Sequence, residues 1–240
     1  MKINEIYLGD CLELMPKHVE DKSIDMIFCD LPYGTTNCKW DSIIPLDELW
    51  KEYERVIKDK GSIVLFSAQP FTSALISSNY KLFKYDWVWE KDRPSNPLVA
   101  NKRVMPRHES VCVFYKKQPT YNPQKQLREE KNKRNNKKDT THNTGTKVGA
   151  MYRSDGNTDL VHPTSIQKFT TGKRGFHPTQ KPLSLIEYMI KTYTNEGDLI
   201  LDNTCGSGTT GLGAKNLNRN YIMMEQDTKY YEIACKRVQE

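Results

Sequence analysis

The sequence DLILDNTCGSGTTG, residues 198–211, decides the fold of this 240-residue chain. Its first half is an apolar run that predicts a buried strand, and its second half is a glycine-rich turn of the form Gly-x-Gly-x-x-Gly that opens a helix. A second apolar run, residues 221–224, ends at Glu225. In a β-α-β unit of this kind the glycines let the backbone approach a ligand and the acid holds ribose hydroxyls, so the stretch indicates a cofactor that contains adenosine.

The position of this unit predicts how the rest of the sheet is built. Residues 228–239 read as one last helix, so the N-terminal part of the chain must supply the remaining strands. Residues 5–10 form a short strand, and the last helix would lead into it if the termini were joined. We therefore expect an α/β fold with a circularly permuted Rossmann-like sheet, in which four acids lie at the carboxyl ends of strands: Asp10, Asp30, Asp202 and Glu225.

A second motif, DLPYG at residues 30–34, directly follows an apolar run that reads as a strand over residues 24–29. An exocyclic amine on a flat base needs two hydrogen-bond acceptors and a stacking surface. Asp30, the carbonyl of Pro32 and the ring of Tyr33 together supply these groups. The alternative interpretation is an ordinary turn after a strand, because proline fixes φ and glycine relaxes it.

Apolar periodicity predicts the remaining elements. Helices are expected at residues 46–58, 70–76 and 183–190, and strands at residues 63–66, 85–90 and 110–115. The last two strands are expected to pair as an antiparallel edge, with residues 91–109 as a long connection between them.

Four segments, in this order along the chain, resemble the motifs of the β-class DNA amino-methyltransferases, which modify adenine N6 or cytosine N4. They are Gly9-Asp10-Cys11, Asp30-Leu31-Pro32-Tyr33, Phe176-His177-Pro178-Thr179-Gln180-Lys181-Pro182 and Asp202-Asn203-Thr204-Cys205-Gly206-Ser207-Gly208-Thr209-Thr210. The resemblance implies S-adenosylmethionine as the cofactor and catalytic roles for Asp30, Pro32 and Tyr33. It also implies these cofactor-binding residues: Asp10, Cys11, Asp30, Thr179, Lys181, Asp202, Asn203, Gly206, Gly208, Thr209, Thr210 and Glu225.

The resemblance also implies how these groups act. Two acceptors on the target amine would pull its nitrogen toward sp³ geometry and make the lone pair available for attack. Tyr33 would stack on a base flipped out of the duplex, and it would also serve as a core aromatic at the strand end. Thr209 and Thr210 would hold the methionine carboxylate at a helix start. Asp10 would meet the adenine of the cofactor, and the alternative for Asp10 is a helix N-cap.

Positive charge is concentrated in the middle of the chain. Residues 91–175 hold 19 Lys and Arg against 7 Asp and Glu, in a protein whose net charge is +6. We expect a basic target-recognition insert that binds double-stranded DNA, and a solvated surface loop is the alternative. The DNA-binding candidates are Lys102, Arg103, Arg107, Lys133, Arg134, Lys137, Lys138, Lys173 and Arg174.

This distribution predicts three regions. Residues 1–90 are the catalytic half of the core, residues 91–175 an edge strand with the basic insert, and residues 176–240 the cofactor-binding half. The sequence leaves open whether residues 116–175 are ordered without DNA, because apolar periodicity is lost there.

Composition excludes several other classes. No apolar run is long enough to span a bilayer, no signal-peptide core follows Met1, and the six cysteines include no Cys-x-x-Cys pair. We therefore expect a cytoplasmic protein with reduced thiols, without a metal site and without membrane contact. A homodimer and a separate restriction endonuclease as partner both stay open.

The predicted function is site-specific transfer of a methyl group to adenine N6 of a flipped base in duplex DNA. Cytosine N4 is the alternative, but cytosine enzymes of the family more often carry serine in place of Asp30. A nicotinamide-dependent oxidoreductase shares the glycine pattern but leaves residues 30–33 unexplained. An inactive DNA-binding protein is the third reading, because Leu31 stands where the family usually has proline.

Overall fold

The computed structural model describes residues 1–35, 41–95, 97–127, 160–171 and 179–239. The chain forms two compact units. Residues Met1–Asn122 and Ser165–Glu240 make up the first, and residues Pro123–Thr164 make up the second. In the second unit, a two-residue strand β6 (Gln126–Leu127) pairs antiparallel with β7 (Leu160–Val161).

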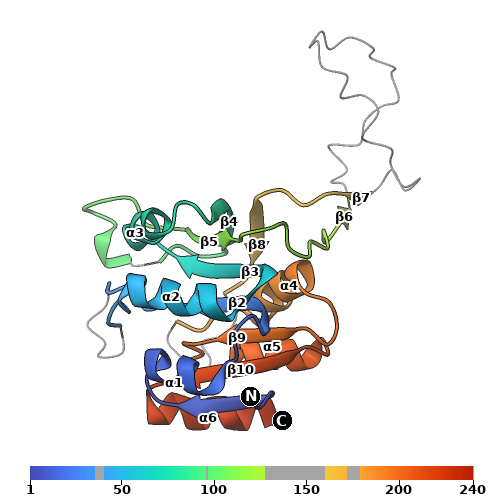
Figure 1. Cartoon of the computed structure of the whole chain (residues 1–240). Helices are drawn as coiled ribbons and strands as arrows, with labels where there is room; N and C mark the ends of the chain where they lie inside the picture. The colour runs from blue at the N-terminus through green and yellow to red at the C-terminus, as the bar shows by residue number, and fades with distance from the viewer. Residues whose placement is uncertain (36–40, 96, 128–159, 172–178, 240) are drawn as a thin grey trace, which may run out of the picture. The chain divides into compact units, whose positions relative to one another are not determined.

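The first unit is built on an eight-stranded sheet with the order β1-β10-β9-β2-β3-β5-β4-β8 (Figure 1). The strands are β1 (Glu5–Leu8), β2 (Ile24–Asp30), β3 (Ile57–Ser67), β4 (Phe83–Lys91), β5 (His108–Phe114), β8 (Ile166–Phe169), β9 (Leu199–Asp202) and β10 (Asn220–Glu225). Every pair from β1 through β10, β9 and β2 to β3 is parallel. The pairing of β1 with β10 places the two ends of the chain side by side, as the circularly permuted sheet requires.

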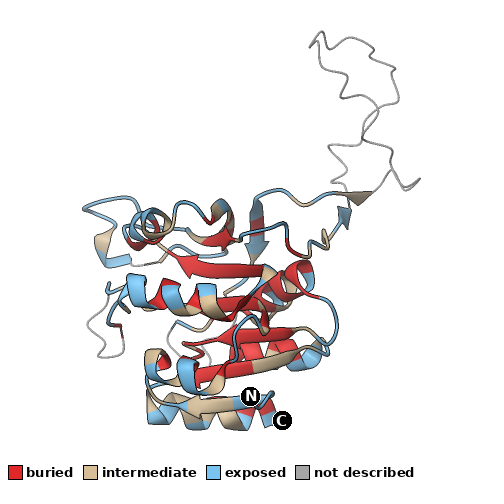
Figure 2. Ribbon diagram, viewed as in Figure 1, coloured by how far each residue is buried: buried red, intermediate tan, exposed pale blue. Residues whose placement is uncertain are grey.

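Alternating side chains of the strands feed two separate cores, because successive residues of a strand point to opposite faces. In β2, Ile27 and Cys29 face one core, whereas Met26 and Phe28 face the other. The central strands are buried on both faces, and Figure 2 shows them in red through the middle of the sheet. Continuous apolar runs are what such a parallel sheet demands, which explains why the sequence of β2 does not alternate.

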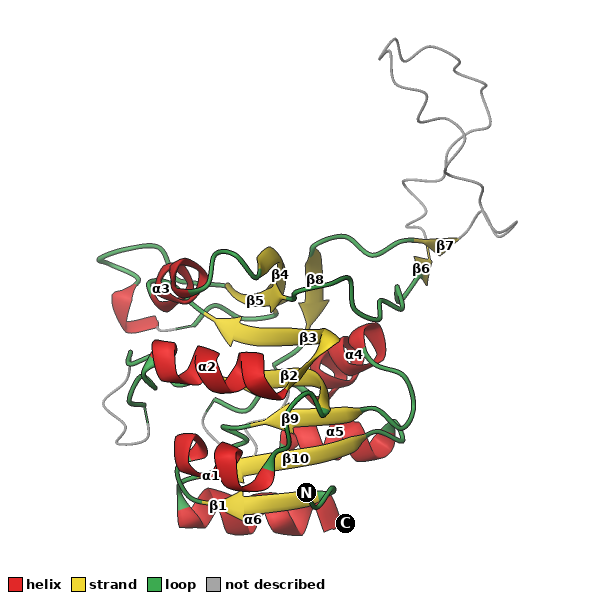
Figure 3. Cartoon of the chain, viewed as in Figure 1, coloured by secondary structure: helices red, strands yellow, loops and turns green. Residues whose placement is uncertain are grey.

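Six helices cover the two faces (Figure 3). Residues of α1 (Cys11–His18), α2 (Leu46–Val56) and α3 (Phe71–Ser78) pack into the core on one face. Residues of α4 (Leu183–Tyr193), α5 (Thr209–Asn216) and α6 (Thr228–Gln239) pack on the other. A 3₁₀ turn, η1 (Pro97–Val99), lies between β4 and β5.

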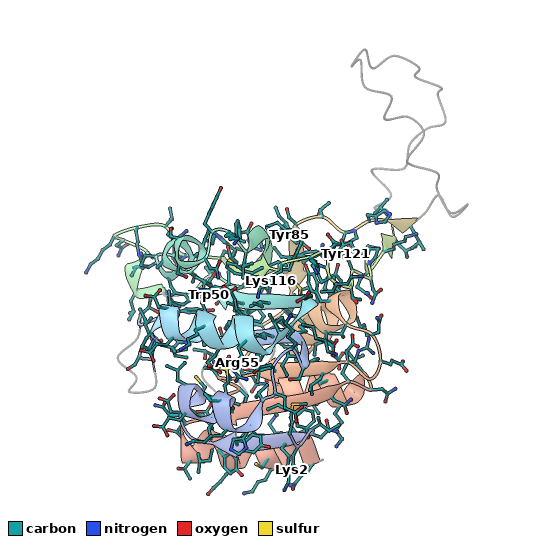
Figure 4. All side chains as sticks on the ribbon, viewed as in Figure 1. Lys2, Trp50, Arg55, Tyr85, Lys116 and Tyr121 are labelled. Atoms are coloured by element: carbon teal, nitrogen blue, oxygen red, sulfur yellow. The ribbon has the colours of Figure 1, made fainter. Side chains whose placement is uncertain are left out.

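Arg55 at the end of α2 ties that helix to α1. Its guanidinium donates to the backbone carbonyl of Val19 at 2.9 Å and to that of Met15 at 3.1 Å. Both carbonyls lie at the end of α1, and that of Met15 also accepts the amide of Val19. Figure 4 shows Arg55 between the two helices, with Trp50 one turn earlier on α2.

Most predicted elements are confirmed, and the sheet edge is the exception. The strands expected at 85–90 and 110–115 pair antiparallel as β4 and β5. They do not form the edge, because β8 pairs with the outer side of β4. The sequence of β8, Ile-Gln-Lys-Phe, has too little apolar pattern to predict a strand. Its backbone bonds to β4 and the indole of Trp89, which donates to the Phe169 carbonyl at 3.0 Å, hold it in place.

The thiols follow the sequence expectation where the structure describes them. Cys29, Cys112 and Cys205 are buried and free of disulfides. Among the described helices, none is both long and apolar enough to cross a bilayer. In the same part of the chain, no three metal-ligating side chains are grouped in a way that could hold a metal ion.

Two isoleucines should show how strongly stability depends on the parallel core. Ile27 at the centre of β2 is fully buried, whereas Ile166 on β8 is 56% exposed. Replacement of Ile27 by alanine should lower the free energy of unfolding by about 2–5 kcal/mol because it leaves a cavity. Replacement of Ile166 should cost about 1 kcal/mol or less. Urea unfolding of both variants measures this, and equal losses would contradict the assigned core.

Candidate active site

Four acids lie along the edge of the sheet at which its parallel strands end, as the sequence predicts. Asp30, Asp202 and Glu225 end β2, β9 and β10, and Asp10 follows β1. Because these strands run parallel, their carboxyl ends meet at the same edge. The chain leaves β2 toward one end of the sheet and β9 toward the other, so Asp30 and Asp202 flank the point where the strand order reverses. Ligands bind at such a point in open α/β sheets.

Asp30 is held on both carboxylate oxygens. The hydroxyl of Tyr33 donates to Oδ1 at 2.7 Å, and the ammonium of Lys181 donates to Oδ2 at 2.5 Å. The side chain of Lys181 is only 7% exposed, whereas that of Asp30 is 27% exposed. The carboxylate is therefore fixed from within the protein and still open to a ligand from outside.

Lys181 continues this contact into a buried chain of alternating charges. Its ammonium lies 3.4 Å from Oε2 of Glu109, and Lys91 lies 2.5 Å from Oε1 of the same carboxylate. Lys91 also donates to the hydroxyl of Ser95 at 3.2 Å. The four charges cancel in pairs, which is the condition under which buried charges are tolerated.

The charges in this chain shift one another. Burial raises the pKa of Asp30 above its ordinary value; Lys181 opposes the shift and the charge of Glu109 adds to it. Burial alone would raise the pKa of Glu109 as well, but Lys181 and Lys91 outweigh burial and lower it. Burial would lower the pKa of Lys181, yet its two carboxylate neighbours raise it. Lys181 and Glu109 are thus both charged around the more easily protonated Asp30.

The rest of the catalytic motif is anchored in the core. The side chain of Leu31 is 4% exposed and packs among the residues under α1 and α2. The ring of Tyr33 stacks on Phe71 with a centroid distance of 5.3 Å. At Gly34, with φ of 66°, the chain turns, and the amides of Gly34 and Thr35 donate to the buried carboxylate of Asp41. Packing of Leu31 thus holds this part of the motif against the core.

The glycine-rich turn adopts the conformation that its sequence predicts. Gly206 and Gly208 have φ of 52° and 78°, in the left-handed region that glycine occupies without strain. Gly211 lies against β10, where a Cβ atom would come within 2.2 Å of the methyl group of Met223. The amide of Gly206 donates to the carboxylate of Glu225 at 2.8 Å, so the turn and the end of β10 are joined directly.

Arg237 of α6 supports this turn from below. Its guanidinium donates to the carbonyl and the hydroxyl of Ser207 and to the hydroxyl of Thr209. The hydroxyl of Thr210 bonds to Asp202. Thr209 and Thr210 are both buried, so their hydroxyls serve the protein itself. The backbone amides at the start of α5 lie at the carboxyl end of the strands, where a ligand is expected.

Asp202, at the end of β9, is buried and strongly perturbed. Burial raises the pKa of Asp202 to about 7, although bonds from Thr210 and from the amide of Thr204 oppose the shift. Thr204 also donates its hydroxyl to the carbonyl of Asp30 at 3.1 Å. This side chain bridges the ends of β9 and β2 and keeps the two halves of the edge in register.

Asn203, one of the predicted cofactor-binding residues, has its side chain engaged within the protein. Its side chain points into the core, where Oδ1 accepts from Tyr53 at 2.6 Å and from the thiol of Cys29 at 2.9 Å. Its amide nitrogen donates to Cys11 at 3.3 Å, and burial raises the pKa of that thiol to about 11. The side chains of Asn203 and Cys11 therefore brace the edge, and cofactor contact by their backbones remains a prediction.

Asp10 and Thr179 complete the predicted cofactor residues. The carboxylate of Asp10 accepts from the amide of Leu12 at 2.8 Å, so the N-cap alternative is confirmed. Asp10 is also exposed at the edge, as contact with a ligand would require. Thr179 is exposed and lies two residues before Lys181.

Three of the DNA-binding candidates lie on the connection between β4 and β5. Lys102, Arg103 and Arg107 are all exposed. Arg107 pairs with Glu90 at 3.4 Å and donates to the carbonyl of Lys91. Six candidates lie outside the described residues: Lys133, Arg134, Lys137, Lys138, Lys173 and Arg174.

Comparison with known proteins identifies the family. A family model described as DNA methylase, covering adenine-N6 and cytosine-N4 enzymes, matches residues 24–236. The chain belongs to this family. The Type II methyltransferase M.HinfI of Haemophilus influenzae is 32% identical over 99% of this chain and 69% of its own length.

Solved structures agree on the fold of this DNA methylase. The cytosine-N4-specific PvuII DNA methyltransferase has a TM-score of 0.72 at 19% identity, over 99% of this chain and 86% of its own. A complex of M1.HpyAVI with S-adenosylmethionine has a TM-score of 0.66 at 24% identity, over 97% and 98% of the two chains. The protein is an S-adenosylmethionine-dependent DNA amino-methyltransferase.

The donors and acceptors at the strand edge fit this cofactor. Glu225 is fixed by the amides of Gly206 and Asp227. It would hold the ribose hydroxyls of the bound cofactor, and the amides at the start of α5 would hold its carboxylate. Asp30 lies beside them, on the other side of the Thr204 bridge. When bound, S-adenosylmethionine supplies an electrophilic methyl group on a sulfonium.

Sequence reasoning missed Glu109, Lys91 and Arg237. The apolar pattern predicts a strand that begins at residue 110 and so places Glu109 in the connection before it. A usable signal was the glutamate directly preceding the run of residues 110–115, since an acid beside a buried strand needs a cation. No pattern pointed to Arg237, because its partners are backbone and hydroxyl groups of a turn 30 residues away.

Opposite shifts of the pH–rate profile should follow when the two neighbours of Asp30 are altered. Glu109→Gln removes a charge that raises the pKa of Asp30, so the acid limb should move to lower pH. Lys181→Met removes the cation that lowers this pKa, so the limb should move to higher pH. Single-turnover methylation rates between about pH 5 and pH 9 locate the acid limb in each variant.

Glu52→Gln is the matched control for this experiment. Glu52 is 14% exposed and paired with Arg55, against 13% for Glu109, but it lies on α2 away from Asp30. Its profile should coincide with that of the unaltered protein. Limbs that move in the same direction in the Glu109 and Lys181 variants would contradict the coupling.

Proposed function

We propose that this DNA methyltransferase modifies N6 of adenine within a specific duplex sequence, in the cytoplasm. The observation that carries the proposal is the carboxylate of Asp30, which is partly exposed at the reversal point of the sheet and held by Tyr33 and Lys181. Enzymes of the cytosine type more often have serine here. A carboxylate accepts more strongly from an amine than a hydroxyl does, which suits the weakly nucleophilic amine of adenine.

The proposed chemistry depends on acceptors at the end of β2. The two N–H groups of the target amine donate to Asp30 and to the carbonyl of Pro32, which draws the nitrogen toward sp³ geometry. A nitrogen–carbon bond forms as the carbon–sulfur bond breaks, and the proton that the nitrogen then carries leaves through Asp30 to solvent. Asp30 must be ionised to accept these bonds, and Lys181 favours that form. Most of the catalysis is positioning and electrostatics.

Access to the amine requires the base to leave the duplex. Flipping costs a few kcal/mol, and an aromatic surface returns about 1–3 kcal/mol by stacking. Tyr33 is the proposed surface. Phe71 stacks on its ring and Asp30 holds its hydroxyl, so its orientation is set before DNA binds.

Nucleoside mass spectrometry tests the proposal. Unmethylated DNA incubated with the protein and S-adenosylmethionine should yield N6-methyladenine. N4-methylcytosine in its place would keep the mechanism and change the base. Absence of both bases, with measurable binding of the cofactor, would overturn the proposal and favour the inactive reading.

Alanine at Asp30 should separate catalysis from cofactor binding. Asp30→Ala should lower the methylation rate by on the order of 10²–10³-fold, because an acceptor preorganised for the transition state is lost. The Kd for S-adenosylmethionine, measured by calorimetry, should change by less than about threefold. Asp59→Asn, which removes an exposed carboxylate on β3, is the control and should leave the rate unchanged. Full turnover of the Asp30 variant would show that the site is assigned wrongly.

A further inference from the structure

The connection between β4 and β5 projects from the edge that carries Asp30. Both β3 and β4 pair antiparallel with β5, so β3 and β4 run parallel and end at the same edge. In Figure 3 the arrowheads of β3 and β1 point to the left of the view, and the connection with η1 projects on that side. Backbone hydrogen bonds close the base of the connection. The amide of Lys91 donates to the carbonyl of Arg107, and the amide of Ser95 donates to the carbonyl of Pro106.

The outer part of this connection, residues 97–105, has a fold of its own. After η1, the amides of Lys102 and Arg103 donate to the carbonyl of Val99 at 2.8 and 2.9 Å. This local turn leaves apolar side chains on the outside. Leu98 is 90% exposed, Val104 88% and Met105 40%.

Exposed aliphatic side chains are common one at a time, but here they gather on one projecting turn beside the catalytic edge. Basic side chains accompany them. Lys102 and Arg103 are exposed within the turn, and Arg93 at its base is 86% exposed. Asp92 at the base accepts from Thr171 and lies 3.6 Å from Arg93, so Lys102 and Arg103 are the cations of the turn itself. Cations beside an apolar tip can bind a partner with negative charge on its surface and apolar groups in its interior.

We propose that residues 97–105 form an insertion loop that enters the DNA duplex beside the target base. Leu98 and Val104 would occupy the stack that the flipped base leaves, and Lys102 and Arg103 would contact phosphates on either side. Apolar side chains that wedge between base steps act in this way in other DNA-binding proteins. The inference rests on the proposed function, since it concerns the same DNA and the same base.

Charge favours DNA over a second copy of this chain as the occupant. Two copies meeting at this turn would bring Lys102 and Arg103 of each close to the same side chains of the other. Like charges at an interface disfavour association. Phosphates at the same positions would instead release counterions and strengthen binding.

A substrate whose target base is already unpaired tests the insertion. The duplexes carry the mapped methylation site, with the target base either paired or opposite an abasic position. The double variant Leu98→Ala with Val104→Ala should methylate the paired duplex at least about tenfold more slowly, because truncation removes most of the apolar surface that fills the gap. On the abasic duplex its rate should fall by less than about threefold, because flipping there costs little.

Two further variants make the result specific. Ile166→Ala removes an exposed isoleucine of β8 that is paired with Val88 of β4, outside the turn, and should leave both rates unchanged. Lys102→Ala with Arg103→Ala should weaken binding of both duplexes equally and lessen its salt dependence. Methylation of the paired duplex by the unaltered protein tests the proposed function separately.

Other outcomes overturn the insertion loop. Equal loss of rate on both duplexes in the Leu98 and Val104 variant would show a role in docking without insertion. Unchanged rates on both would remove any role of the turn on DNA. The unaltered protein could also sediment as a dimer and the double variant as a monomer. That result would show that the apolar tip binds a second copy of the chain.

Discussion

The parallel pairing of β2 with β9 joins the two halves of this chain, and the whole site depends on it. Met26 and Ile27 pair with Ile200 and Leu201, which brings the ends of both strands to one point. Asp30 and Asp202 then flank that point, and Thr204 bridges them through the carbonyl of Asp30. Groups predicted to serve catalysis and groups predicted to bind the cofactor, 174 residues apart at Asp30 and Thr204, become neighbours through a few backbone hydrogen bonds.

The same geometry creates an electrostatic difficulty that the structure resolves locally. Carboxylates crowded at one edge, away from water, favour protonation, as the pKa of about 7 for Asp202 shows. At Asp30 the protein opposes this tendency with Lys181, and it stabilises the charge of Lys181 in turn with Glu109 and Lys91. Each charge requires the next, so removal of one partner would leave an uncompensated buried ion.

Much of this site could be predicted from sequence, because apolar runs that end in an acid specify both a strand and its useful end. The limits of α6 agree with the last helix predicted after Glu225. Contacts that depend on distant segments could not be predicted. Asn203 turns into the core because Tyr53, 150 residues away, supplies its partner, and Glu109 is buried because cations from two other segments meet there. Strand β8 exists because β4 offers it a backbone ladder, which its own four residues do not reveal.

The strand that pairs with the other end of the chain also sets an order of events during synthesis. Asn4 beside β1 bonds to Tyr221, 217 residues later, so β1 leaves the ribosome long before β10 exists. Contacts this far apart slow folding, and an apolar strand left waiting would be prone to aggregate. β1 has only four residues, two of them exposed even in the finished sheet. A first strand this short, with no fully buried residue, leaves little apolar surface uncovered until translation delivers its partner.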